Sequence, residues 1–160
     1  MNPSRRPRRA KIAGGDEAPA LTLTQASIRV EKLAYVLVVN RAQKYGRKKS
    51  HIVYIGTTKK GVDRIAGSIA AKAREALEFH GVNSVEAFVY SCRARRGTTM
   101  WQILERGLLL SFRERYGCLP IFNKQGQSFD WDQVEPYLSP AGLKNVIRRY
   151  EPLTSRRKRS

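Results

Sequence analysis

A single carboxylate interrupts the apolar stretch ILERGLLL, which runs from Ile103 to Leu110. In a helix with 100° per residue, Glu105 would lie inside the arc formed by the large apolar side chains Trp101, Leu104, Leu108, Leu109 and Phe112. Taking a carboxylate out of water is costly unless a hydrogen-bond network, a cation or a metal ion compensates its charge. Glu105 is therefore the first candidate for a chemical role, and its immediate neighbours leave all three partners open.

The net charge is the strongest compositional feature, because the 160 residues include 31 basic and 13 acidic ones and carry a formal charge of +18. The excess is not confined to the ends, since residues 29–130 contain 19 basic and eight acidic side chains. Such a surface attracts polyanions through counterion release and long-range steering, so nucleic acid is the expected partner. A ribosomal-type or merely solubilising surface is the alternative that charge alone leaves open.

The cysteines, histidines and apolar runs indicate neither a zinc site nor a membrane segment. Cys92, Cys118, His51 and His80 form no close-spaced ligand set, and so few cysteines suit a reducing compartment. No apolar run approaches the ~18–20 residues that span a bilayer, and no apolar signal core follows the basic N-terminus. We expect a cytoplasmic or nucleoid-associated protein without membrane contact, or a nuclear one in a eukaryotic host.

Three strands are predicted among the elements that must position Glu105. Apolar runs rich in β-branched and aromatic residues predict strands over Leu33 to Asn40, His51 to Thr58 and Val85 to Cys92. The polar residues 41–50 predict a long basic loop that joins the first two strands as an antiparallel hairpin.

Helices are predicted between and after these strands. Apolar residues at three- and four-residue spacings predict a helix over Gly61 to His80, and a second helix, N-capped by Thr98 or Thr99, extends to about Gly117. Two short helices, broken near Pro140, are predicted within residues 131–150. The order predicts an α+β fold, with a small three-stranded antiparallel sheet flanked by helices and a helical C-terminal extension.

This order divides the chain into three parts. Residues 1–21 are rich in proline, glycine and arginine and predict a flexible basic arm, after which a short helix is expected around Gln25 to Lys32. Residues 22–130 form the predicted folded domain, and residues 131–160 form the helical extension and a basic tail.

Several residues on these elements resemble the GIY-YIG nuclease superfamily. The tripeptides LAY (33–35) and YIG (54–56) lie on consecutive predicted strands; the first keeps the family's tyrosine but departs at its other two positions, and the second is intact. Arg64 follows early in the first long helix, Glu105 lies in the second, and Asn123 lies in the loop PIFNKQG. The resemblance spans residues 33–126 and implies the family's small helix-flanked sheet.

The resemblance also implies a set of catalytic residues. Glu105 would hold one divalent cation, Mg²⁺ or Mn²⁺, and Arg64 would bind the scissile phosphate through its planar guanidinium. Tyr35 and Tyr54 would flank the attacking water, one of them as general base or as orienter. A tyrosine base at neutral pH needs its pKa lowered by about three units from about 10, so orienting water is the more economical role for one of the pair. Asn123 would steady the cleft or the glutamate by hydrogen bonding.

Contacts to the nucleic-acid backbone are expected from cationic side chains in the predicted loops. These residues are Arg47, Lys48, Lys49, Lys59, Lys60, Arg93, Arg95, Arg96 and Lys124. Tyr45 and Trp131 are candidates for stacking on bases or wedging between them. The sequence has no zinc finger or recognisable recognition helix, so the extension over residues 131–150 is the expected source of specificity.

The expected function is a metal-dependent DNA endonuclease that leaves 5′-phosphate and 3′-hydroxyl ends. A restriction-like or mobile-element nuclease is the first expectation, and a repair or structure-selective nuclease is the second. The resemblance implies double-stranded DNA as the substrate. It also allows a homodimer as the active form. The rival interpretation is a basic nucleic-acid-binding protein that keeps the same fold and performs no chemistry.

Overall fold

The computed structural model describes residues 32–59 and 61–153, and for residues 61–65 it describes the backbone only. Three parts of the chain lie outside the described residues: the predicted basic arm, Lys60 and the tail after residue 153. The short helix predicted around Gln25 to Lys32 also lies outside them, except for Lys32. The described chain forms one three-stranded antiparallel sheet with three α-helices, the last of them in the C-terminal extension. The predicted α+β fold is confirmed.

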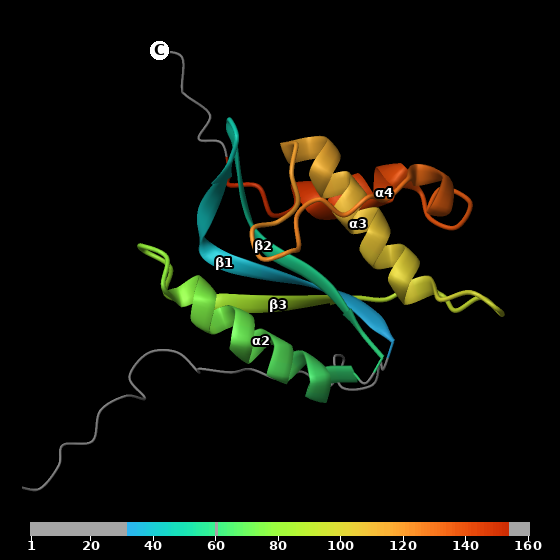
Figure 1. The fold of residues 1–160 in the computed structure, drawn as a ribbon, viewed down its shortest axis with the longest axis horizontal. Helices are drawn as coiled ribbons and strands as arrows, with labels where there is room; N and C mark the ends of the chain where they lie inside the picture. Colours follow the sequence, from blue (N-terminus) through green and yellow to red (C-terminus); the bar gives the residue numbers. More distant parts are fainter. Residues whose placement is uncertain (1–31, 60, 154–160) are drawn as a thin grey trace, which may run out of the picture.

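The sheet has the strand order β2–β1–β3, with both pairs antiparallel (Figure 1). β1 spans Leu33–Tyr45, β2 spans Lys48–Thr58 and β3 spans Val85–Tyr90. Residues 33–39 of the central strand are buried on both faces of the sheet, which explains why they form an unbroken apolar run in the sequence.

The long basic loop predicted over residues 41–50 is wrong, because β1 and β2 continue through almost all of it. Gly46, with a φ of 60°, and Arg47 form a two-residue turn that joins the strands. Most side chains on this outer part of the hairpin are exposed, so polar residues fit the strands there. The polar composition thus reflects solvent exposure and not a loop conformation.

Two long helices lie at the predicted positions. α2 spans Gly61–Leu77 and ends three residues before the predicted end. α3 spans Met100–Tyr116 and is terminated by Gly117, whose φ of 79° lies in the left-handed region that favours glycine. Thr99 occupies the N-cap position, although its side chain makes no capping hydrogen bond. Within the described ranges, no helix combines the length and the apolar character needed to cross a membrane.

The two long helices cover opposite faces of the sheet and create two separate cores (Figure 1). On the α2 side, Tyr35 and Leu37 of β1 pack in one cluster with Ala76. On the α3 side, Val36 of the same strand packs in another cluster with Leu108. The alternation of side chains along a strand produces this division, because successive residues point to opposite faces.

The C-terminal extension packs against α3. It contains a 3₁₀ turn, η1 (Trp131–Gln133), and the helix α4 (Pro140–Arg148). Pro140 begins α4 and does not break a helix, since a first-turn proline lacks only an N–H that would have no helical partner. The Ser139 side chain accepts a hydrogen bond from a backbone N–H of the first turn and caps the helix.

A glycine in α3 allows α4 to approach closely. A Cβ at Gly107 would lie 2.6 Å from Cδ1 of Leu143 and 3.0 Å from Cγ1 of Val134. Both of these residues belong to the α3-side core. Gly107 therefore allows the C-terminal extension to pack closely against α3.

Candidate active site

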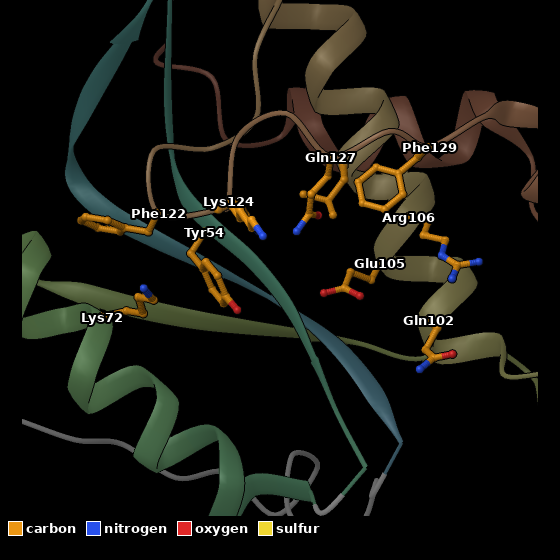
Figure 2. Close-up of a pocket in the computed structure, with 11 residues that line it drawn as sticks. Tyr54, Lys72, Gln102, Glu105, Arg106, Phe122, Lys124, Gln127 and Phe129 are labelled. Carbon is orange, nitrogen blue, oxygen red and sulfur yellow. The ribbon is translucent and has the colours of Figure 1, made fainter.

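A cleft of about 390 Å³ opens at the outer edge of β2, between α2 and α3 (Figure 2). Tyr54 reaches it from β2, Lys72 from α2 and Glu105 from α3. The loop after α3 closes a further side with Asn123 and Lys124. Three of the five predicted catalytic residues therefore line one cleft: Tyr54, Glu105 and Asn123.

Glu105 is half-buried, and its carboxylate projects from α3 toward Tyr54 (Figure 2). Desolvation by burial raises the pKa of Glu105, opposed by the nearby charge of Arg106 and by a hydrogen bond to the side chain of Thr57. A hydrogen bond and a cation are thus both present, yet the pKa remains above the ordinary value. The charge of the carboxylate is incompletely compensated, so a further cation in the cleft would be favourable.

Tyr35 and Tyr54 form a pair on the α2 side of the sheet. Their ring centroids lie 5.9 Å apart at an angle of 49°, and their hydroxyl groups are hydrogen-bonded to each other. Gly56 provides the space for this pair, because a Cβ there would lie 2.6 Å from Cε1 of Tyr54 and 3.0 Å from each hydroxyl oxygen. The glycine of the YIG tripeptide is therefore required by the close approach of both rings.

The two tyrosines are not equivalent. Tyr35 is only 2% exposed and lies behind Tyr54, which lines the cleft. Burial raises the pKa of Tyr54 to about 12, with further contributions from Tyr35 and from the charge of Glu105. The side chains around Tyr54 thus shift its pKa away from the value that a general base needs at neutral pH. Tyr54 is therefore a phenol that donates its proton to Tyr35, and its oxygen can accept a hydrogen bond from a water in the cleft.

Asn123 fixes the loop after α3 to the edge of β2. Its side-chain oxygen accepts a hydrogen bond from the backbone N–H of Ile55 at 3.0 Å, and its amide nitrogen donates to the Ile55 carbonyl at 2.8 Å. The backbone N–H of Phe122 donates to the Val53 carbonyl in the same way. These bonds satisfy part of the open edge of β2 and hold Phe122 and Asn123 at the cleft.

Lys72 is a cleft residue that the sequence interpretation did not single out. Its ammonium lies 5.7 Å from the ring centroid of Tyr54 and 5.8 Å from that of Phe122, and 3.7 Å from Glu75. Position 72 follows position 64 by eight residues, which is about 80° around the helix, so helical periodicity gives only a weak signal for Lys72. Gln102, Arg106, Phe122, Gln127 and Phe129 also line the cleft; no spacing in the sequence connects these with Tyr54.

The other predicted site residues are distributed over three regions. Arg64 lies in the first turn of α2, but its side chain is outside the described residues, as is Lys60. Lys59 is exposed directly after β2. Three exposed arginines precede α3: Arg93, Arg95 and Arg96. Three exposed cations lie at the hairpin turn: Arg47, Lys48 and Lys49.

The hairpin cations are distant from the cleft. Tyr54 lies six positions after Lys48 along β2, which corresponds to about 20 Å. These cations therefore do not contribute to the cleft itself.

The stacking role considered for Tyr45 is wrong. Tyr45 is 6% exposed and donates a hydrogen bond to the Ile52 carbonyl at 2.7 Å, so its ring belongs to the core. Trp131 is partly exposed, but its indole N–H donates to Glu114 at 2.6 Å and the ammonium of Lys144 lies 5.6 Å from its ring centroid. Its ring is thus held against α3 and α4.

No protein-family model, curated protein or solved structure matches this chain. The resemblance to the GIY-YIG superfamily therefore rests on the residues of the sequence alone.

Proposed function

We propose that this chain is a metal-dependent endonuclease of GIY-YIG type that hydrolyses phosphodiester bonds in double-stranded DNA. The products would carry 5′-phosphate and 3′-hydroxyl ends. Within this class of enzyme, we propose a compact restriction-like or mobile-element nuclease. The choice of DNA over RNA rests on the family resemblance.

The observation that carries the proposal is the meeting of Tyr54 and Glu105 at one cleft. The tyrosine pair lies on the α2 face of the sheet, whereas Glu105 comes from the helix on the opposite face. They meet only because the cleft extends around the edge of β2. A phenol and a desolvated carboxylate, with the ammonium groups of Lys72 and Lys124, form a site suited to an anionic substrate.

The donor set of the cleft fits a hard divalent cation. Of the described residues that line it, Glu105 is the one carboxylate, and Gln102 and Gln127 contribute side-chain amides, whereas the Asn123 amide is bonded to Ile55. Mg²⁺ and Mn²⁺ prefer oxygen ligands, and Mg²⁺ commonly binds through one or two carboxylates with water and substrate phosphate. Glu105 would hold the ion, and its incomplete charge compensation would favour binding. When bound, the ion would supply positive charge to the phosphate and to the leaving oxygen.

The residues of the chain would perform the remaining tasks. Lys72 and Lys124 attract the phosphodiester and orient it toward the cleft. Tyr54 orients the attacking water by accepting a hydrogen bond from it, and Tyr35 fixes the Tyr54 hydroxyl from behind by accepting its proton in a hydrogen bond. Asn123 holds the loop after α3, which forms one wall of the cleft, against β2.

Cleavage of supercoiled plasmid by wild-type protein, Glu105→Gln and Glu78→Gln, with Mg²⁺ or with EDTA, tests the proposal. Glu78 is exposed directly after α2, so its substitution removes the same charge away from the cleft. We expect metal-dependent cutting by the wild type and by Glu78→Gln. Glu105→Gln should be inactive and should bind DNA within a few-fold of the wild type, because Glu105 contributes no cationic contact.

Three results would contradict parts of the proposal. DNA binding without cutting, across Mg²⁺, Mn²⁺ and branched substrates, would favour the binding protein that performs no chemistry. Preferential cutting of RNA would support phosphodiester hydrolysis but would contradict DNA as the substrate. A flat response of binding to salt would argue against nucleic acid as partner, because phosphate contacts make affinity fall steeply with salt.

A further inference from the structure

A second hollow, of about 200 Å³, lies away from the cleft, between the C-terminal half of α3, α4 and the start of β2. We call it the α3–α4 groove. Its polar lining consists of Lys48, Ser111, Glu114, Arg115, Lys144 and Arg148. Ser111 follows Glu105 by six residues, which places it about 9 Å farther along α3 and about 120° around it. The groove and the cleft therefore use different faces of the same helix.

Ser111 contributes a buried hydroxyl without a hydrogen-bond partner. The residue is 1% exposed, and its Oγ is the one buried side-chain polar atom in the described ranges that lacks a partner. A buried hydroxyl without a partner destabilises a fold, and such groups are uncommon unless a ligand, ion or water satisfies them. Ser111 lines the groove, so an acceptor bound there would receive its proton.

Cationic side chains line the same groove as Ser111, and hydrogen bonds hold several of them in place. The ammonium of Lys48 donates to the Arg115 carbonyl at 3.0 Å, which leaves further N–H groups for another acceptor. Arg115 is fixed by two bonds to Glu151, at 2.6 and 3.0 Å. Arg148 is exposed at the rim.

The one carboxylate of the groove is already occupied. Glu114 accepts hydrogen bonds from the Trp131 indole and from Lys144, the latter at 2.8 Å. Its charge is therefore compensated within the protein. The charge that remains for a ligand is positive.

We propose that the α3–α4 groove binds a phosphate group, with Lys48, Arg148 and the Ser111 hydroxyl as donors. A phosphate presents several strong acceptor oxygens, which matches a set of ammonium, guanidinium and hydroxyl donors around a small volume. The group can belong to a nucleic-acid backbone or to a free phosphate or phosphomonoester. The proposal does not depend on catalysis in the cleft.

Titration with inorganic phosphate, followed by thermal shift against sodium chloride of equal ionic strength, tests the site. The variant Lys48→Ala/Arg148→Ala removes two groove cations. The variant Lys49→Ala/Arg149→Ala removes two exposed cations from the adjacent positions outside the groove. We expect phosphate affinity to fall about 100-fold in the first variant and less than about twofold in the second, since each charged hydrogen bond contributes roughly tenfold.

Ser111→Ala provides a test that changes no charge. The substitution removes an unsatisfied hydroxyl, so the melting temperature without phosphate should not fall, while phosphate affinity should fall about threefold to tenfold. Equal phosphate affinity in the two double variants, or unchanged affinity in Ser111→Ala, would refute the site. Any phosphate binding would then reflect only the general positive charge of the protein.

Duplex DNA distinguishes the two sources of the phosphate. A greater loss of DNA affinity in Lys48→Ala/Arg148→Ala than in its control, with a salt slope lower by about two, would assign the groove to the nucleic-acid backbone. Equal DNA binding with selective loss of phosphate binding would assign it to a free phosphate or phosphomonoester. Phosphate binding at the groove is measured without a divalent cation and without cleavage, so a failure of the proposed nuclease function would not affect this result.

Discussion

Gly56→Ala should separate catalysis from folding, because it introduces one carbon atom between the two tyrosines. The new Cβ would lie 2.6 Å from Cε1 of Tyr54, whereas carbon atoms pack at about 3.5–4.0 Å. The ring of Tyr54 must therefore move by about 1 Å. The same atom would lie 3.0 Å from the hydroxyl oxygens of Tyr35 and Tyr54, so their mutual hydrogen bond would be distorted as well.

The expected effect on activity is larger than the effect on stability. A displacement of about 1 Å at a reacting group can lower a rate about 100-fold, so plasmid cleavage should fall by roughly this factor. Inserting one methyl group into a packed site costs about 1–3 kcal/mol. In a chain of this size each kcal/mol lowers the melting temperature by about 2–4 °C, so Gly56→Ala should remain folded at 25 °C.

Gly67→Ala is the matched control. Gly67 lies in α2, and a Cβ there would meet no atom within 4 Å. Alanine in a helix interior is more stable than glycine by about 0.5–1 kcal/mol, so the melting temperature should rise while cleavage is unchanged. The measurements are single-turnover cleavage, DNA affinity and thermal unfolding of both variants. Full cleavage by Gly56→Ala would refute the argument that this glycine positions the tyrosine pair, and an equal loss of DNA affinity would show that binding and not chemistry was affected.

Three further predictions concern stability. Asn123→Ala removes two hydrogen bonds to the Ile55 backbone and should lower the free energy of unfolding by about 1–3 kcal/mol in chemical denaturation; an unchanged midpoint would show that water replaces both bonds. Gly107→Ala forces a Cβ to 2.6 Å from Leu143 and should cost about 1–3 kcal/mol, whereas Gly142→Ala, which meets nothing within 4 Å, should not destabilise α4. Because the folded-state pKa of Glu105 is raised, deprotonation of its carboxylate destabilises the fold as pH rises from the ordinary value of 4.5 through the raised pKa, and this effect is absent below 4.5. In EDTA, Glu105→Gln should therefore melt at a higher temperature than the wild type at neutral pH and at the same temperature in acid, and a higher-melting wild type at neutral pH would contradict the burial argument.

The sequence predicted the elements well where periodicity determines them. The apolar run of β1 and the helical spacing around Glu105 reflect burial, which the structure confirms. The basic hairpin was mistaken for a loop because exposed strands and loops have the same polar composition. A two-residue turn at Gly46 gives only a weak local signal.

The arrangement of the cleft depends on contacts that no local pattern records. Asn123 binds Ile55 across 68 residues of sequence, and Lys72 lies near Tyr54 only because α2 packs beside β2. The motif placed both tyrosines on the strands but could not show that Tyr35 is buried behind Tyr54. These features follow from the tertiary packing of the helices on the sheet.

The division of the molecule into two cores has a consequence for how mutations combine. Leu37 belongs to the α2-side core and Leu108 to the α3-side core, and the sheet separates them. Substitutions at the two positions should have additive effects on stability, because they share no partners. Their effects on cleavage should not add, since one core supports the tyrosine pair and the other supports Glu105. A chain of this kind can accumulate stabilising changes independently on each side of the sheet, while the proposed cleavage would depend on the relative position of the two sides.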